Sequence, residues 1–251
     1  MTDDTELLKK RLLELAVKAE SGCYYTFSDF LGLLEQSAFR EIASKIRSKY
    51  TLFGGVTGAE RIIVRFGDPE DIGYDMPFPI KCILISPKDE KFAENLSHRD
   101  YLGALMNLGI ERAKLGDIVV RGKSAYLFSD EDIADYIIRE LTKVRRTDVK
   151  LSLTEPPSGD ELFRTERRRV QAQGERLDGV IAKLYSISRE DSLSLFKKKL
   201  VFADGRQIEN NSYIPKAGEV ISVRGYGRFI YLGYETLSRK GKLNIDLDLY
   251  V

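Results

Sequence analysis

Residues 175–191 read ERLDGVIAKLYSISRED, and this stretch decides the fold of the C-terminal third of the chain. Apolar residues recur in it at helical spacing and predict one buried helix face: Leu177, Val180, Ile181 and Leu184. Ser188, with Asp191 three residues later, is typical of the capping box that begins a second helix. We therefore expect two short, closely connected helices here.

Strand-like segments follow this helix pair. Residues 201–203 and 206–208 flank Asp204-Gly205, the two-residue signal of a hairpin with a primed turn. From Leu243 to Val251 apolar and polar residues alternate, which is typical of a half-buried strand. The sequence thus predicts a small α+β domain over residues 175–251.

A linker is expected before this domain. The segment from Thr154 to Asp160 holds two prolines among turn-forming residues, a composition that disfavours a helix. A basic stretch, residues 164–169, comes next. We assign residues 156–174 to the linker and this basic stretch.

Residues 78–155 alternate between strand and helix patterns. The segments are a strand at 81–85, a helix at 100–108 ended by Gly109, a hairpin around Gly122, a helix capped by Ser129 with Asp132, and a strand at 144–153. The order β-α-β-β-α-β is that of a ferredoxin-like unit, which is also RNA-recognition-like.

The first 77 residues are predicted to form an N-terminal, mainly helical domain. Two apolar stripes at helical spacing support this: Leu8, Leu12, Leu15, Ala16 and Ala19, then Phe39, Ile42, Ala43 and Ile46. A strand-like segment, residues 61–66, follows the glycines near position 55. The fold class of the whole chain is therefore predicted as α+β in three domains.

Charge is distributed unevenly along a chain whose formal net charge is only +1. Residues 164–251 hold 17 Lys and Arg against 11 Asp and Glu, a net +6, which leaves 23 against 28, a net −5, for residues 1–163. A basic end can present a field to a polyanion even when the average is neutral. This asymmetry predicts a polyanionic partner for the C-terminal third.

The composition argues against several other classes. Two isolated cysteines, Cys23 and Cys82, are too few for a disulfide framework or a thiolate metal site. The acidic N-terminus does not resemble a signal peptide, and no apolar run approaches the ~18 residues of a membrane span. We expect a cytoplasmic monomer without a metal or other cofactor.

The candidate RNA-binding residues of the C-terminal domain are the cationic side chains of its two helices and the serine that caps the second helix. Arg176 and Lys183 are seven residues apart on one helix face, and Arg189 lies in the first turn of the second helix, where N–H groups attract phosphate. The others are Ser188, Lys197, Lys198 and Lys199. Tyr226 and Phe229 are weighed as base-stacking residues against a core role.

The C-terminal segments resemble the RNA-binding domain named after ribosomal small-subunit protein four, here called the S-four domain. The resemblance is carried by Glu175-Arg176-Leu177-Asp178, Ile187-Ser188-Arg189, residues 197–201, Asp204-Gly205 and residues 218–225. In that family a basic residue opens the first helix and Ser-Arg opens the second. The resemblance implies that the second helix N-terminus and nearby cations meet the RNA backbone.

Nearly the whole chain resembles the YlmH-type bacterial proteins. The motifs are residues 98–110, Lys114-Leu115-Gly116-Asp117-Ile118, Gly54-Gly55 and Ala59-Glu60-Arg61. The resemblance implies structured RNA as partner, rRNA or tRNA on the large ribosomal subunit, and a role in rescuing stalled translation. Asp204-Gly205 replaces the Asn-Gly of many relatives, and both pairs suit the turn.

Two roles remain possible for each of the polar candidates in the central domain. Arg99, Arg112 and Lys114 are candidates for a basic RNA-binding surface on the central domain, or for scattered solvated charge. His98, the single histidine, is assigned to a helix-start hydrogen bond or an RNA contact.

The sequence gives little support to the hypothesis that the chain is an enzyme. A kinase loop fails because Leu105 stands where Asn is required. The tripeptide Arg176-Leu177-Asp178 resembles that of pseudouridine synthases, but no catalytic domain follows it. We expect no catalytic residue. An RNA-modifying enzyme of pseudouridine synthase type and a protein–protein adaptor are the alternatives.

Overall fold

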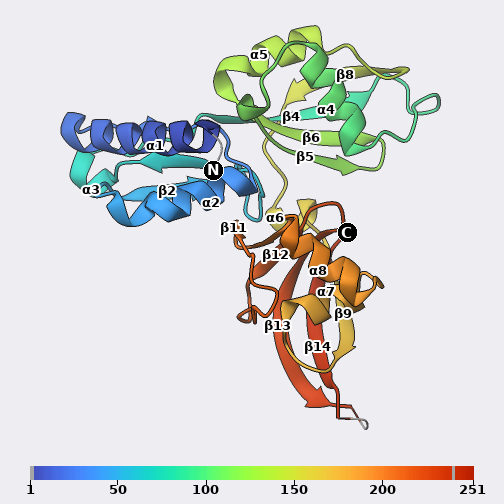
Figure 1. Cartoon of the computed structure of the whole chain (residues 1–251). Helices are drawn as coiled ribbons and strands as arrows, with labels where there is room; N and C mark the ends of the chain where they lie inside the picture. The colour runs from blue at the N-terminus through green and yellow to red at the C-terminus, as the bar shows by residue number, and fades with distance from the viewer. Residues whose placement is uncertain (1–2, 239–240) are drawn as a thin grey trace. The chain divides into compact units, whose positions relative to one another are not determined.

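The chain was analysed in a computed structural model that describes residues 3–238 and 241–251 (Figure 1). It divides into two compact units, Met1–Leu162 and Phe163–Val251. Helices and antiparallel sheets occur in both units, so the predicted α+β class is confirmed.

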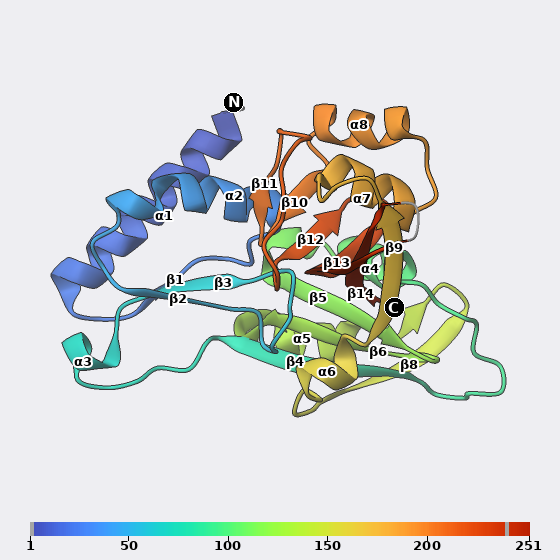
Figure 2. The ribbon, with the colours of Figure 1, turned by 90° about the horizontal axis from the view of Figure 1, so that it is seen from below.

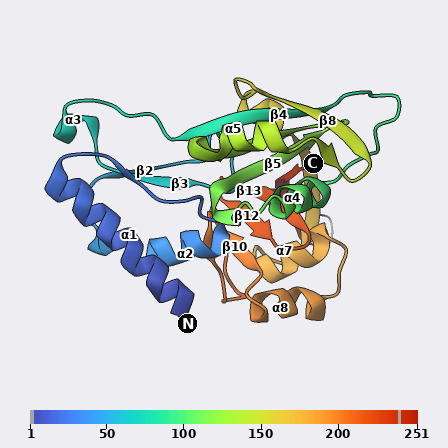
Figure 3. The ribbon, with the colours of Figure 1, turned by 90° about the horizontal axis from the view of Figure 1, so that it is seen from above.

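The N-terminal part of the first unit combines helices with a small sheet. Its elements are α1 (Asp3–Gly22), β1 (Thr26–Phe27), α2 (Leu33–Ile42), the 3₁₀ helix η1 (Ala43–Lys45), β2 (Tyr50–Phe53), β3 (Ile63–Phe66) and α3 (Pro69–Ile72). The strands pair antiparallel in the order β1-β3-β2, a sheet that helical periodicity did not predict. Leu12, Phe39, Val64 and Phe66 share one core between helices and sheet. Figure 3 shows α1 and α2 next to the strands β2 and β3.

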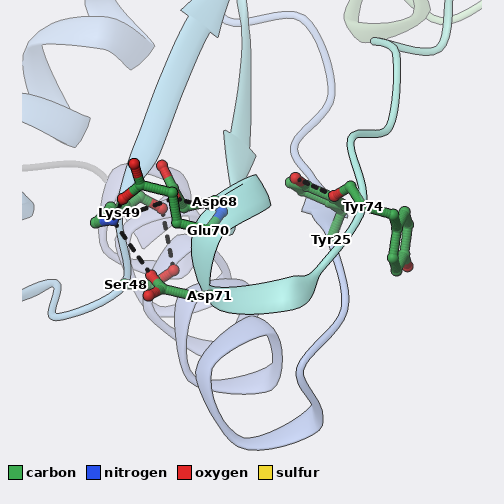
Figure 4. A network of polar contacts seen from close by, with 7 residues as sticks. All are labelled: Tyr25, Ser48, Lys49, Asp68, Glu70, Asp71 and Tyr74. Atoms are coloured by element: carbon green, nitrogen blue, oxygen red, sulfur yellow. Dashed lines mark hydrogen bonds and ion pairs between the residues drawn. The ribbon is translucent and has the colours of Figure 1, made fainter.

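A network of ion pairs joins the start of β2 to α3. The ammonium group of Lys49 lies 3.1 Å from carboxylate oxygens of Asp68 and Glu70 and 3.6 Å from Asp71 (Figure 4). Asp68 also caps α3, because its carboxylate accepts a 2.9 Å hydrogen bond from the backbone N–H of Glu70. The network fixes the short helix α3 against the sheet.

The central part of the first unit is a five-stranded antiparallel sheet with two helices on one face. Its elements are β4 (Ile80–Pro87), α4 (His98–Asn107), the 3₁₀ helix η2 (Arg112–Lys114), β5 (Leu115–Arg121), β6 (Ser124–Asp130), α5 (Glu131–Glu140), β7 (Lys143–Val144), β8 (Thr147–Leu153) and α6 (Gly159–Leu162). The strand order is β5-β6-β4-β8-β7. Helices α4 and α5 cover one face (Figure 1), and α6 lies on the side of the other (Figure 2).

Two local predictions for the central part were wrong. Ser129 does not cap α5, because it is a buried residue of β6 that pairs with Lys81 of β4. The N-cap residue is Asp130, whose carboxylate accepts a hydrogen bond from the backbone N–H of Asp132. The strand expected over residues 144–153 is interrupted by a turn in which Arg145 has φ 52°. A capping box does occur in α4, between Ser97 and Asp100.

The second unit is a six-stranded antiparallel sheet packed against a helix pair. Its elements are β9 (Thr165–Ala172), α7 (Leu177–Leu184), α8 (Arg189–Lys197), β10 (Val201–Ala203), β11 (Arg206–Gln207), β12 (Val220–Val223), β13 (Gly227–Leu237) and β14 (Leu243–Tyr250). The strand order is β11-β10-β12-β13-β14-β9. Asp204 and Gly205 both have positive φ, 46° and 74°, so the predicted primed turn between β10 and β11 is confirmed.

The basic stretch that we assigned to the linker is strand β9 at an edge of this sheet. Arg167 lies 2.7 Å from Asp248, and Arg169 lies 2.6 Å from Asp246, each pair facing across β9 and β14. Alternate arginines are therefore matched by alternate aspartates, a cross-strand arrangement that stabilises the sheet. Arg167 and Arg169 are thus already paired within the domain.

Among the residues that the structure describes, no helix is both long and apolar enough to cross a membrane.

Candidate nucleic-acid interface

The two helices of the second unit place two arginines at their N-terminal ends. Arg176 is the N-cap residue of α7, and Arg189 is the first residue of α8. Ser188 caps α8 as predicted: its hydroxyl oxygen accepts a 3.0 Å hydrogen bond from the backbone N–H of Asp191. The hydroxyl of Ser192 donates to the carbonyl of Asp178 at 2.7 Å and holds α8 against α7.

Asp178 connects these two arginines. Its side chain is 0% exposed, and one carboxylate oxygen accepts from Arg176 Nε at 3.1 Å. The other oxygen lies 3.3 Å from a terminal guanidinium nitrogen of Arg189. The arginine side chains themselves remain 44% and 65% exposed. A buried anion thus holds two cations at the surface.

A hollow of about 430 Å³ opens beside this trio. Its lining includes Arg176, Lys183 and Arg189, so the structure brings together three of the cations that we expected to bind RNA. Lys242, next to the start of β14, adds a fourth cation. Such a concentration of positive charge around one depression suits a phosphate group.

The remaining predicted cations of this unit do not line the hollow. Lys197 ends α8, and Lys198 is its C-cap residue. Lys199 has φ 60° and forms a 3.0 Å ion pair with Glu209. These three lysines form an exposed group at the opposite end of α8 from Arg189.

The N-terminus of α8 should attract a phosphate less strongly than the sequence analysis predicted. Glu190 and Asp191 both lie in the first turn of the helix. Their carboxylates oppose the positive end of the helix dipole that would favour a phosphate. Arg189 therefore depends more on its pairing with Asp178 than on the helix terminus behind it.

Sequence reasoning missed Asp178 and Lys242 as parts of this site. Asp178 follows Arg176 by two residues, but its contact with Arg189 spans 11 positions and depends on the packing of α7 against α8. Lys242 belongs to a basic run, residues 239–242, which could have drawn attention to the β13–β14 connection.

The aromatic candidates differ in accessibility. Phe229 is fully buried in the core of the second unit, so the core role is confirmed for it and base stacking is excluded. Tyr226 is 43% exposed and packs on Tyr185 with ring centroids 5.2 Å apart. Tyr226 alone of the two remains open to a base.

In the central part, Arg99 is exposed at a second hollow of about 580 Å³, which lies between α4 and the segment from the end of α5 to Arg145. Lys143 and Arg145 also line it, and Arg145 lies 3.5 Å from Asp100. Glu140 contributes an opposing charge. The second hollow is thus lined by three cations and two carboxylates, whereas the first is lined by four cations and the single carboxylate of Asp178.

Arg112 and Lys114 are engaged by partners within the first unit. Arg112 donates to the carbonyl oxygens of Leu115 and Gly116 at 2.6 and 3.1 Å, and desolvation followed by the nearby Arg61 lowers its pKa to about 10. Lys114 forms ion pairs with Asp29 and Asp130, at 3.0 and 2.8 Å. The structure does not bring these two side chains together with Arg99 at the second hollow.

The motifs at residues 59–61 and 114–118 form a seam between the N-terminal and central parts. The carboxylate of Asp117 accepts from the backbone N–H groups of Glu60 and Arg61, at 2.6 and 3.2 Å. The guanidinium of Arg61 donates to the carbonyls of Leu115, Phe30 and Arg112. Gly116 is required because a Cβ there would lie 2.7 Å from the ring of Phe30.

His98 is the first residue of α4 and is exposed. Partial desolvation and the charge of Arg112 lower its pKa below the ordinary histidine value. The capping hydrogen bonds come from Ser97 rather than His98.

The surroundings of Asp178 do not match those of a catalytic carboxylate that is open to a substrate. Asp178, the aspartate of the synthase-like tripeptide, is buried and paired with two arginines. No group of three or more His, Cys, Asp or Glu side chains is arranged to hold a metal ion in these residues.

Comparison with known proteins identifies the central part. A family model described as "Putative RNA-binding domain in YlmH" matches residues 76–156. "Ribosome-associated protein quality control protein P2" of Bacillus subtilis (strain 168) is 29% identical over 231 residues, which cover 88% of this chain and 86% of the relative. A solved structure, "Cell division protein ylmH from Streptococcus pneumoniae", aligns with a TM-score of 0.49 and 21% identity over 61% of this chain and 93% of that chain.

The family model and the relative support an RNA-binding role for this chain. They confirm its resemblance to the YlmH-type proteins, most directly over residues 76–156.

Proposed function

We propose that this chain is a non-catalytic protein that binds structured RNA through the hollow between α7, α8 and the start of β14. The observation that carries the proposal is the gathering of Arg176, Lys183, Arg189 and Lys242 around one depression. Cations in this arrangement contact phosphates and read the shape of an RNA rather than its sequence. In this proposal the second unit acts as an S-four domain.

The distribution of charge supports binding through the second unit. The net +6 lies on residues 164–251, whereas the rest of the chain is net −5. RNA contacts would therefore concentrate on the second unit, and their strength would fall as salt rises because released counterions drive the binding. The central part, which the family model describes as an RNA-binding domain, would add a second contact through Arg99.

The proposed RNA is ribosomal RNA or tRNA on the large ribosomal subunit. This step rests on the relative named as a ribosome-associated quality control protein and on the extent of the match. The chain would act in the cytoplasm as a monomer, without a cofactor, during the rescue of stalled translation. A synthase reaction is disfavoured because the carboxylate of Asp178 is not open to a nucleobase.

Two experiments test this proposal. Fluorescence anisotropy of the full chain with a labelled RNA hairpin should give an affinity that falls steeply with salt. Sedimentation of the chain with purified bacterial ribosomal subunits should place it with the large subunit. Equal affinity at low and high salt would refute the electrostatic account, and sedimentation with the small subunit alone would refute the ribosomal assignment.

A further inference from the structure

Asp178 is an unusual feature of the second unit because it is a carboxylate with 0% side-chain exposure. Burying an ionised carboxylate is costly unless partners compensate its charge. The side-chain partners of Asp178 are two guanidinium groups: Arg176 donates to both carboxylate oxygens, and Arg189 donates twice to Oδ2, which it shares with Arg176. The carboxylate therefore fixes the positions of both guanidinium groups.

Each guanidinium keeps donors for another ligand. A guanidinium carries five N–H donors, and Asp178 uses two nitrogens of each arginine. Both side chains are partly exposed and line the same hollow. Two planar donor groups are thus held beside one depression with unused N–H groups on each.

We propose that Asp178 is a positioning residue that holds Arg176 and Arg189 as a paired donor for one phosphate group of RNA in this hollow. The inference rests on the proposed function and deepens it, because it assigns the ligand class and the residue that organises the site. Arginines fixed before binding lose less conformational entropy when the phosphate arrives, which strengthens binding. Lys183 and Lys242 add positive charge to the same hollow.

Two simpler roles for the arginines predict a different outcome. If they served only as unspecific positive charge, removing the negative charge of Asp178 would strengthen RNA binding. If they served only to neutralise the buried carboxylate, their loss would affect stability and leave RNA affinity unchanged. Positioning predicts that removal of the carboxylate weakens binding although the chain becomes more positive.

Glu190 provides the matched control. It is exposed in the first turn of α8, next to Arg189, and does not line the hollow. Glu190→Gln and Asp178→Asn each remove one negative charge from the same region. The difference between the two variants therefore isolates positioning from net charge.

The experiment measures the Kd of the full chain for a fluorescein-labelled RNA hairpin by anisotropy at several salt concentrations. Circular dichroism first confirms that each variant is folded. We expect Glu190→Gln to bind as tightly as the parent or slightly more tightly, and Asp178→Asn to bind about tenfold more weakly. In an Arg176→Ala/Arg189→Ala background, Asp178→Asn should have no larger effect than Glu190→Gln.

Each outcome separates the inference from the proposed function. If the parent does not bind the hairpin, both the proposed function and the positioning role are refuted. Binding by the parent together with equal or tighter binding by folded Asp178→Asn would overturn the positioning role alone.

Should Asp178→Asn fail to fold, the parent itself supplies the test. In ¹⁵N-labelled full chain, the Nε–H signals of Arg176 and Arg189 should both shift as the hairpin is added. Hairpin binding that leaves both signals unmoved would overturn the inference.

Discussion

Arg189 lies 3.3 Å from the carboxylate of Asp178, although the two residues belong to different helices and are 11 positions apart. The sequence alone predicts only that Arg189 lies at a helix N-terminus with free N–H groups. Arg189 is instead one half of an arginine pair held by a buried anion, with acidic residues in the turn behind it.

Arg189→Ala should weaken RNA binding by ~1–3 kcal/mol, the scale of charge-assisted hydrogen bonds. Arg189→Lys should recover only part of this loss, because an ammonium group cannot reproduce the planar fork. Lys216→Ala is the control and should bind like the parent, since Lys216 is exposed in the same unit outside the hollow. Anisotropy with a labelled hairpin measures all three. A folded Arg189→Ala that binds like the parent would place the RNA elsewhere.

Lys183→Ala and Lys242→Ala should each reduce the salt dependence of RNA binding. Each removes one cation from the lining of the hollow, so the slope of log K against log salt should decrease by about 1. Binding titrations over a salt series provide the slope. An unchanged slope for Lys242→Ala would exclude Lys242 from the site.

Ser188→Ala should destabilise the second unit without a direct effect on RNA. Its hydroxyl accepts the N–H of Asp191, and loss of such a cap costs ~1 kcal/mol of folding free energy. Thermal and urea unfolding measure this loss. At a temperature where the variant is folded, its RNA affinity should match that of the parent, and a large drop in affinity would indicate that the hydroxyl contacts RNA.

Arg61→Ala should destabilise the first unit by ~1–3 kcal/mol, because three carbonyl acceptors lose a charged donor. Urea unfolding of the full chain, monitored in the first unit, measures the change. Arg99→Ala is the comparison, since Arg99 is exposed and should leave stability unchanged. Equal stability of the parent and Arg61→Ala would show that the seam contributes little.

The free energy of unfolding should decrease in acid because specific aspartates become protonated. The N–H and hydroxyl of Ser97 lower the pKa of Asp100, and Arg169 lowers the pKa of Asp246. A carboxyl group with a lowered folded-state pKa contributes stability above its unfolded pKa of ~4, and this contribution is lost as pH falls through the folded pKa. Urea unfolding from neutral pH downward should show this loss, with a shallower decline in Asp100→Asn. A decline equally steep in both proteins would exclude Asp100 as a cause.

Local patterns in the sequence predicted much of the second unit correctly. The apolar spacing around Val180, the cap at Ser188 and the Asp204-Gly205 turn are each encoded within a few residues, and all three are present. Three of the candidate cations also came together, because Arg176 and Lys183 share one helix face and Arg189 begins the next helix.

Features that depend on distant partners could not be predicted in this way. The arginines of β9 looked like a free basic stretch because their aspartate partners lie 77 and 81 residues away in β14. Lys114 looked like a solvated cation because its partner Asp29 is remote in sequence. In both cases tertiary pairing neutralises charge that composition alone assigns to the surface.

The position of RNA on the chain is the central claim, and crosslinking measures it most directly. The full chain is irradiated in complex with ribosomal RNA, and the crosslinked peptides are identified by mass spectrometry. We predict that crosslinks concentrate between residues 171 and 189, the stretch that supplies most of the lining of the hollow, and at Lys242, with fewer near Arg99. Crosslinks confined to residues 76–156 would contradict the account and assign RNA binding to the central part alone.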